Sequence, residues 1–309
     1  KTYHKCLVAK DEDAAKLCDQ LTHVRDLTNP FILHTRDIFQ GRRHRIVCKI
    51  DEKNVYVLTD FCSGGNLFTM LQTFGHLNES HVKFIVPQLV TALSYLHENR
   101  CIHGNLICEN VLLDEQGNTV LTGFSNSIFN YPTPCYETIG FTECLAPETL
   151  LNKGIDKMYD FWMLDVSSMV VSYWFYFVEL IEGHPPFQGD TVSETLQAIL
   201  IGKIEYKYAS PDAQQFIGAL LTAEPTQRLG KDIRSIRNHP VFIWLLLIIQ
   251  FMKGVDWVNI SNKSIPSPLM RISKPEDPTC YCFHFKEDII DEREGLVEYH
   301  NNVFAKYFQ

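Results

Sequence analysis

Apolar residues recur at intervals of three and four positions in several stretches of the chain, a spacing that predicts helices with one buried face. The first stretch is 11–26, whose apolar stripe consists of Ala14, Leu17, Leu21 and Val24. The pair Asn29-Pro30 should end this region, because the residue before a proline disfavours the helical conformation. A second, short helix is expected over Asn66–Phe74, after the break Ser63-Gly64-Gly65.

A longer periodic stretch, from Asn78 to Glu98, predicts a buried helix. Asn78 is a suitable N-cap residue, and Pro87 should kink the helix because it lacks a backbone N–H. From about Glu148 to Phe242 the pattern indicates further helices separated by glycine and proline. The second part of the chain is therefore expected to be mainly helical.

Two regions have the composition of strands. Asn54–Thr59 is rich in β-branched and aromatic residues, and Val111–Leu113 and Thr119–Thr122 flank the turn Asp114–Gly117, which predicts a hairpin. The chain thus combines strands with helices, and the predicted fold class is α+β.

Composition narrows the class of protein. The 309 residues are 45% hydrophobic and 21% charged, as in ordinary globular proteins. The net charge of −9 argues against nucleic-acid binding and favours basic partners. The longest apolar run, 241–252, is about twelve residues long and contains Gln250, so no transmembrane segment is expected.

The ten cysteines include no C-x-x-C pair, and the first residues, KTYHKCLVAK, lack the apolar core of a secretory signal. Reduced thiols are therefore expected. This favours the cytoplasm, with the nucleus as a second compartment.

Four motifs follow one another in a fixed order: Cys101–Leu113 (CIHGNLICENVLL), Thr122–Ser125 (TGFS), Ala146–Glu148 (APE) and Asp160–Trp162 (DFW). They resemble the protein-kinase catalytic loop H-R-D-L-x-x-x-N, the D-F-G turn, the A-P-E motif and a later helix. Four further segments resemble the AGC group of serine/threonine kinases, and most of all the catalytic subunit of cAMP-dependent protein kinase: Ser63–Phe68, Gly140–Glu148, Gln227–Gly230 and Asn238–Phe242.

The resemblance covers nearly the whole chain and implies a bilobal kinase fold. It divides the chain into a partial N-lobe at 1–61, a mainly α-helical C-lobe at 62–254 and an AGC-type C-terminal tail at 255–309. Lys1 falls where the family has the ATP lysine of its third strand, and Gln20 falls where helix C carries glutamate. The expected N-lobe is therefore truncated, without the strands of the glycine-rich loop.

The sequence departs from the family at catalytic positions. Asn105 replaces the aspartate that accepts the substrate proton, and an amide takes up no proton near neutral pH. Ile107 replaces a lysine that contacts the γ-phosphate, and Gly104 replaces the loop arginine. These departures predict a degenerate, pseudokinase-like chain.

ATP and Mg²⁺ are the cofactors that the resemblance implies, and the same departures put their binding in question. The corresponding ATP positions are Lys1, Asp60, Asn66 and Asn110. For the metal, Gly123 replaces a ligating aspartate and only Asn110 remains. One amide oxygen is a poor Mg²⁺ site, so Asn110 is more consistent with a loop-bracing role than with metal binding.

Other positions carry binding or structural roles in the resembled kinases. The acidic residues that bind basic peptides correspond to Glu109, Glu143 and Glu179, although solvated or capping roles are the simpler interpretation. The structural positions are Glu148 and Arg228, which form a buried ion pair in the family, and Asp160, which braces the catalytic loop. His103 is interpreted as a packing residue under the loop.

Three segments of about ten residues match neither the family nor a regular pattern: Gly41–Ile50, about Ser167–Phe175 and Ile243 to about Met252. Their positions suggest, as a hypothesis, unspliced coding sequence.

Three functions are consistent with the sequence. The leading hypothesis is a catalytically impaired scaffold that binds a basic peptide, a protein substrate or inhibitor, or a kinase regulatory subunit. The alternatives are an active or weakly active ATP-dependent serine/threonine kinase and a non-functional or mis-spliced gene product.

Overall fold

The computed structural model describes residues 2–4, 11–40, 54–132, 135–136, 145–164, 177–182, 186–187, 189, 191–228 and 255–271. They fall into two compact units, the first within Lys1–Phe61 and the second within Cys62–Tyr281. Each unit is considered by itself below.

The first unit combines a three-stranded antiparallel sheet with one helix. Its elements are β1 (Thr2–His4), α1 (Asp11–Asp26), β2 (Thr35–Gln40) and β3 (Asn54–Thr59). The strand order is β1-β3-β2, so β3 is the central strand, and Ile38 pairs with Val57 in the core. Helix α1 lies against β2 and buries Cys18, Leu21 and Val24. The helix predicted over 11–26 and the strand predicted over 54–59 are confirmed.

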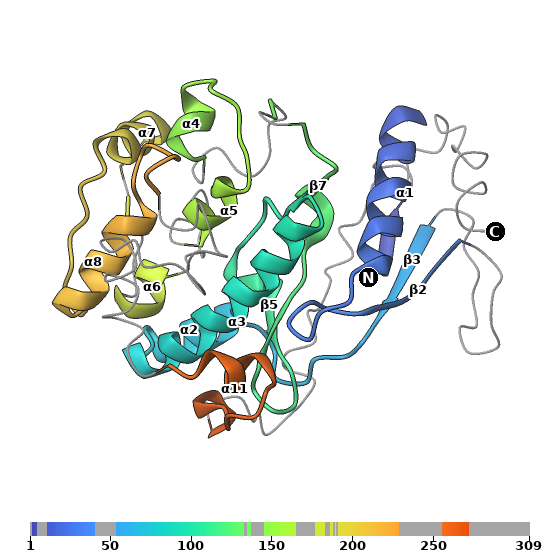
Figure 1. Ribbon diagram of the computed structural model, residues 1–309, viewed down its shortest axis with the longest axis horizontal. Coiled ribbons are helices and arrows are strands. Elements are labelled where there is room, and N and C mark those ends of the chain that lie inside the picture. The colour runs from blue at the N-terminus through green and yellow to red at the C-terminus, as the bar shows by residue number, and fades with distance from the viewer. Residues whose placement is uncertain are drawn as a thin grey trace. The chain divides into compact units, whose positions relative to one another are not determined.

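The second unit is mainly helical (Figure 1). Its α-helices are α2 (Leu67–Phe74), α3 (Glu79–Glu98), α4 (Pro147–Leu150), α5 (Met158–Met163), α6 (Phe177–Glu182), α7 (Val192–Ile201), α8 (Pro211–Leu220) and α11 (Trp257–Ser261). Its short strands are β4 (Cys101–Ile102), β5 (Val111–Leu113), β6 (Thr119–Leu121) and β7 (Ile128–Phe129). Its 3₁₀ helices are η2 (Cys108–Asn110), η3 (Phe124–Asn126) and η5 (Pro268–Arg271). β5 and β6 form the predicted hairpin, and β4 pairs with β7.

Helix α3 is the core element of this unit and contacts α6, β4, β6 and α11. It runs through Pro87, and the buried side chain of Gln88 accepts hydrogen bonds from the N–H and the hydroxyl of Thr119 at 2.7 and 2.9 Å. Asn78 is the N-cap residue of α3, as predicted, but its side chain makes no capping hydrogen bond. The Asn78 carbonyl accepts from the N–H groups of His81 and Val82 instead, so the first turn is closed by the backbone.

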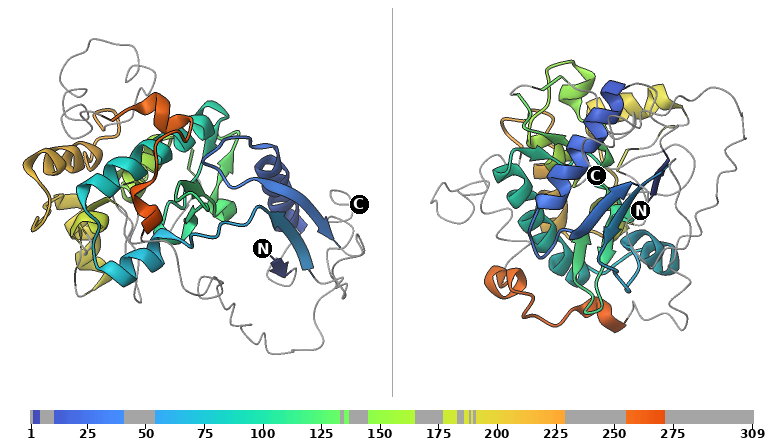
Figure 2. Two further views of the ribbon diagram at one scale, coloured as in Figure 1. Left: turned by 90° about the horizontal axis from the view of Figure 1, so that it is seen from below. Right: turned by 90° about the vertical axis from the view of Figure 1, so that its right-hand side faces the viewer.

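A segment near the C-terminal end of the chain packs on this unit. Helix α11 lies against α3, and residues 255–271 pass by the β5–β6 hairpin (Figure 2). Lys263 Nζ lies 2.9 Å from a carboxylate oxygen of Asp114, and the Ser267 hydroxyl donates to the Gly117 carbonyl at 2.7 Å. Leu269 is fully buried. These contacts attach the segment to the hairpin turn.

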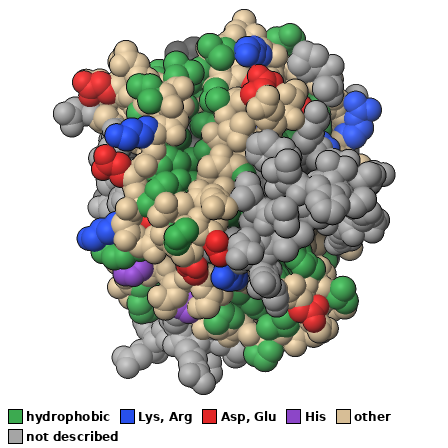
Figure 3. All heavy atoms as spheres, turned by 60° about the vertical axis from the view of Figure 1, so that its left-hand side comes forward, with side chains coloured by type: hydrophobic (Ala, Val, Ile, Leu, Met, Phe, Trp, Pro, Cys, Tyr) green, Lys and Arg blue, Asp and Glu red, His purple; other side chains and the backbone are tan. Residues whose placement is uncertain are grey.

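The described surface on the side of α7 and α8 carries apolar side chains among isolated charged ones (Figure 3). Leu200 and Ile201, at the end of α7, are among the exposed apolar residues. Within the described part of the chain, no helix is long and apolar enough to cross a bilayer. The three irregular segments of the sequence, 41–50, 167–175 and 243–252, lie outside the described residues.

Candidate active site

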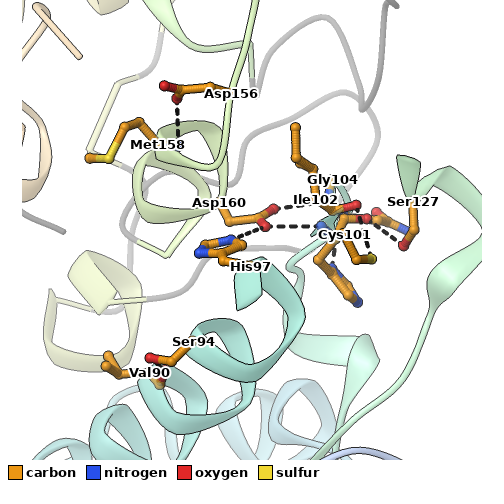
Figure 4. Close-up of polar contacts among 12 residues, drawn as sticks. Val90, Ser94, His97, Cys101, Ile102, Gly104, Ser127, Asp156, Met158 and Asp160 are labelled. Atoms are coloured by element: carbon orange, nitrogen blue, oxygen red, sulfur yellow. Dashed lines mark hydrogen bonds and ion pairs between the residues drawn. The ribbon is translucent and has the colours of Figure 1, made fainter. Parts of the chain in front are cut away.

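The segment that follows β4 is anchored by the buried carboxylate of Asp160 in α5 (Figure 4). One oxygen accepts from the N–H of Gly104 at 2.9 Å. The other accepts from the N–H of His103 at 2.9 Å and lies 2.7 Å from Nε2 of His97. Two of these three hydrogen bonds hold the segment that follows β4, in agreement with the loop-bracing position that the resemblance gave Asp160, and the third joins Asp160 to α3.

The bonds at Asp160 also determine its charge state. Burial alone would raise the pKa of this carboxyl, but the hydrogen bond from His97 opposes burial. The electrostatic influence of His97 and His103 and the Gly104 N–H act in the same direction, so the pKa lies below its usual value. Asp160 is thus a fully buried, ionised anchor that accepts three hydrogen bonds from its neighbours.

His103 is held as a neutral ring. Its Nε2 lies 3.0 Å from the Thr122 carbonyl, and its Nδ1 lies 3.3 Å from the N–H of Asn105. A carbonyl requires a donor and an N–H requires an acceptor, so the ring is the Nε2–H tautomer. Burial lowers the pKa of His103, in agreement with this assignment, and Phe124 contacts the ring edge-on at 5.0 Å between centroids.

Asn105 lies on this loop with only 8% of its surface exposed. Its carbonyl accepts from the N–H of Ile107 at 3.1 Å and from the side-chain amide of Asn110 at 2.9 Å. Its Oδ1 is buried and has no hydrogen-bond partner among the described residues. The loop therefore offers an amide oxygen, which can accept a hydrogen bond but cannot act as a general base.

Gly123 and the side chain of Asn110 lie next to each other. Gly123 has φ +89° and ψ +38°, a left-handed conformation that L side chains rarely adopt. A Cβ placed on Gly123 would overlap the carboxamide of Asn110. The Asn110 side chain thus fills the space that an aspartate at position 123 would need.

This corner does not fit the Mg²⁺ ion that the fold family implies. Mg²⁺ prefers six oxygen ligands, usually including one or two carboxylates. Here Gly123 supplies no side chain, so the corner offers one amide oxygen, that of Asn110, and no carboxylate. No cluster of three or more His, Cys, Asp or Glu side chains suited to a metal occurs in the described ranges.

Arg228 and Glu148 form the buried pair that the resemblance implied. Nη1 and Nη2 of Arg228 donate to the two carboxylate oxygens at 2.7 and 2.8 Å, and neither side chain is more than 3% exposed. The remaining Arg228 donors bond to the carbonyls of Met158, Thr222 and Ala223. Trp162 lies under the guanidinium at 4.9 Å. All five N–H groups of Arg228 therefore have acceptors.

Two expected nucleotide positions have other partners. Asn66 caps helix α2: its Oδ1 accepts from the N–H and the hydroxyl of Thr69 at 2.8 and 3.0 Å. In the first unit, Asp60 accepts from Arg36, and both side chains are exposed. Lys1 lies outside the described residues.

Of the expected peptide-binding acids, only Glu109 has a described side chain, and it is half-buried in the middle of η2. Glu143 lies outside the described residues. Glu179 belongs to α6 by its backbone, and its side chain is outside the described set. The peptide site stays a prediction.

Sequence reasoning missed two residues that hold the loop. His97, at the end of α3, bonds to Asp160, and the Ser127 hydroxyl donates to the His103 carbonyl at 2.8 Å. The signal for His97 was its place in the helical pattern, one residue after the buried Leu96 and four after the buried Leu93. A polar residue on a buried helix face requires a polar partner.

The loop, the glycine turn and the Glu148–Arg228 pair together define a protein-kinase type of domain, with mixed helix and strand content. A model of the protein kinase domain matches residues 2–242. The chain therefore belongs to the protein kinase family.

Its relatives are AGC-group serine/threonine kinases. The chain is 32% identical to serine/threonine-protein kinase SCH9 of Saccharomyces cerevisiae over 85% of its own length and 29% of that protein. It is 31% identical to human ribosomal protein S6 kinase alpha-2, over 81% of the chain and 33% of the relative. A probable serine/threonine-protein kinase of Dictyostelium discoideum is 30% identical over 82% and 50%. The chain spans half or less of the length of each.

Proposed function

We propose that this chain is a catalytically impaired AGC-type kinase domain that acts by binding. The observation that carries the proposal is that Asn105 and Gly123 stand at the positions where the family's chemistry needs a base and a metal-binding carboxylate. A missing general base typically costs 10²- to 10⁴-fold in rate. Ile107, in place of the γ-phosphate lysine, removes a cation as well.

The residues that hold the loop and the helical unit are present, although the reactive groups are missing. Asp160 still orients the loop, and Arg228 still binds Glu148. A fold stabilised in this way can present a surface without performing phosphoryl transfer.

The proposed partner is a basic peptide, carried by a protein substrate, an inhibitor or a kinase regulatory subunit. The net charge of −9 and the half-buried Glu109 support an Arg- or Lys-rich ligand. We also propose that the chain is more similar to cAMP-dependent protein kinase than to other AGC kinases. The proposed arrangement is bilobal with a truncated N-lobe, and the proposed location is cytoplasmic or nuclear. ATP and Mg²⁺ would be absent or dispensable cofactors.

The test is a transfer assay paired with a binding assay. When the purified chain is mixed with labelled ATP and an Arg-rich serine peptide, phosphate transfer to the peptide should not exceed that of an Asn105→Ala control. The same peptide, labelled with a fluorophore, should bind, and Glu109→Gln should weaken it. Transfer that disappears in Asn110→Ala would overturn the proposal, because it would show a working metal ligand.

An active or weakly active serine/threonine kinase is the second candidate. The relatives named above carry that activity in their names, and the Ala146-Pro147-Glu148 motif is intact with its ion pair. In this case Asn105→Asp should raise an existing rate rather than create one.

A further inference from the structure

The loop that leads into α8 is held by two carboxylates, which together accept from the N–H groups of successive residues. Glu182, the last residue of α6, accepts from the N–H groups of residues 207–209 at 2.6–3.1 Å and is 3% exposed. Glu79, the first residue of α3, accepts from the N–H of Ser210 at 2.9 Å. Consecutive backbone N–H groups can bind an anion in this way. The backbone of this loop is therefore fixed to α6 and α3.

The fixed loop presents a stack of rings at the surface. The ring of Tyr208 lies parallel to that of His76, with 4.8 Å between the centroids and 2° between the planes. Lys207 Nζ lies 4.8 Å from the centroid of the Tyr208 ring. All three side chains are exposed, Tyr208 to 48%, and Phe74, two residues before His76, is 47% exposed. We call Phe74, His76, Lys207 and Tyr208 the basic aromatic patch.

Both segments of the basic aromatic patch are tied to the helical core. Besides the bonds of Glu182, the N–H of Leu77 donates to the carbonyl of Leu180 in α6, which fixes the backbone next to His76. Side chains on a fixed backbone lose less freedom on binding, and tyrosine is enriched among the residues that dominate binding energies. The patch therefore has the preorganisation that a docking surface requires.

The charges of the patch indicate its partner. Lys207 is a cation, and the imidazole of His76 and the hydroxyl of Tyr208 can each donate a hydrogen bond. The acids that hold the loop direct carboxylate oxygens to its backbone, as Glu182 and Glu79 show. We propose that the basic aromatic patch binds an acidic peptide segment of a partner protein, in which aromatic side chains lie between carboxylates. The carboxylates pair with Lys207 and His76, and the aromatic side chains pack on the exposed rings.

This surface goes beyond the proposed function, which concerns a basic ligand and Glu109. The whole chain carries a net charge of −9 and so repels acidic peptides in general. Binding of an acidic peptide therefore requires a local cationic site. Glu205 is an exposed acid of the same loop, so Glu205→Gln should strengthen the binding.

The first experiment measures fluorescence anisotropy with the full chain and a labelled peptide of repeated Glu-Glu-Phe units. We expect saturable binding that added salt weakens, and no binding of the matched Gln-Gln-Phe peptide. Tyr208→Ala and Lys207→Glu should each weaken the affinity about tenfold or more. Lys203→Glu changes another exposed lysine of this loop and, as the matched control, should weaken it less than about threefold. Equal losses at 203 and 207, or no saturable binding, would overturn the proposal.

The second experiment tests the anchoring of the loop with the same peptide. Glu182→Gln should also weaken binding, because a carboxamide has only one oxygen to accept the bonds of residues 207–209. Tyr208→Phe keeps the ring and should retain most of the affinity. Unchanged affinity in Glu182→Gln would refute the preorganisation step. Circular dichroism shows whether each variant is folded, and the exposed positions 207 and 208 still decide the outcome if Glu182→Gln is not.

Two further measurements separate this proposal from its alternatives. Glu109→Gln should leave the affinity for the acidic peptide unchanged, so that failure of this proposal and failure of the proposed function are distinguishable. Sedimentation of the chain alone should show no association through the patch. Self-association that Lys207→Glu abolishes would identify a second copy of the chain as the occupant and would contradict the proposal.

Discussion

Arg228 offers the strongest single test of how the helical unit is held together. Replacing it with methionine keeps much of the volume but leaves Glu148, which is 3% exposed, without its guanidinium. The carbonyls of Met158, Thr222 and Ala223 lose a donor in the same step. The damage is therefore an unpaired buried charge together with three weakened acceptors.

Removing one partner of a buried ion pair typically costs 3–5 kcal/mol. We expect about 4 kcal/mol for Arg228→Met. This corresponds to a Tm decrease of roughly 8–16 °C, at the 2–4 °C per kcal/mol usual for domains of 150–250 residues. The assay is thermal unfolding followed by circular dichroism, with urea unfolding as a second measure.

Two controls make the result specific. Arg36→Met removes an arginine from an exposed bond to Asp60 and should leave Tm unchanged within error. The double variant Arg228→Met/Glu148→Leu, which removes both charges, should recover most of the loss. A decrease below about 1 kcal/mol for Arg228→Met alone would refute the reasoning, because Glu148 would then be solvated or neutral.

Three further changes test the loop and its supports by thermal unfolding. Asn66→Ala should lower the free energy of unfolding by about 1 kcal/mol, because the cap bonds to Thr69 are lost. An unchanged Tm together with weaker ATP binding would contradict the cap role. The lowered pKa of His103 makes the wild type lose stability as pH falls from about 6.5 toward that pKa, and His103→Gln should flatten this slope. The lowered pKa of Asp160 stabilises the fold above about pH 4, so Asp160→Asn should lower Tm at pH 7, and the gap should narrow in acid.

Local patterns predicted the regular elements well. The helix at 11–26 and the hairpin around Asp114–Gly117 depend on periodicity and turn residues within a short window, and both occur. Asn66 shows the limit of reasoning from a family position. The resemblance assigned it to a cofactor, whereas its side chain caps helix α2 by accepting from the N–H of Thr69.

The candidate site could be predicted only in part. The sequence identified the missing carboxylates at 105 and 123. It could not show that Asn110 fills the space beside Gly123, because that depends on the φ of +89° and on the path of η2. The bond between His97 and Asp160 joins residues 63 apart, and such a pairing depends on tertiary packing.

The bonds of Ser267 and Lys263 to the hairpin turn join residues 150 and 149 apart in the chain. During synthesis the hairpin leaves the ribosome long before its partners exist, since about 150 residues take roughly 8–30 s at 5–20 residues per second. In that interval the Asp114 carboxylate has only the partners within the turn, the N–H groups of Gln116 and Asn118 and the Asn118 side-chain amide, and the Gly117 carbonyl lacks its Ser267 donor. The turn is thus completed by nearly the last described residues to emerge, which makes this contact a late step of cotranslational folding.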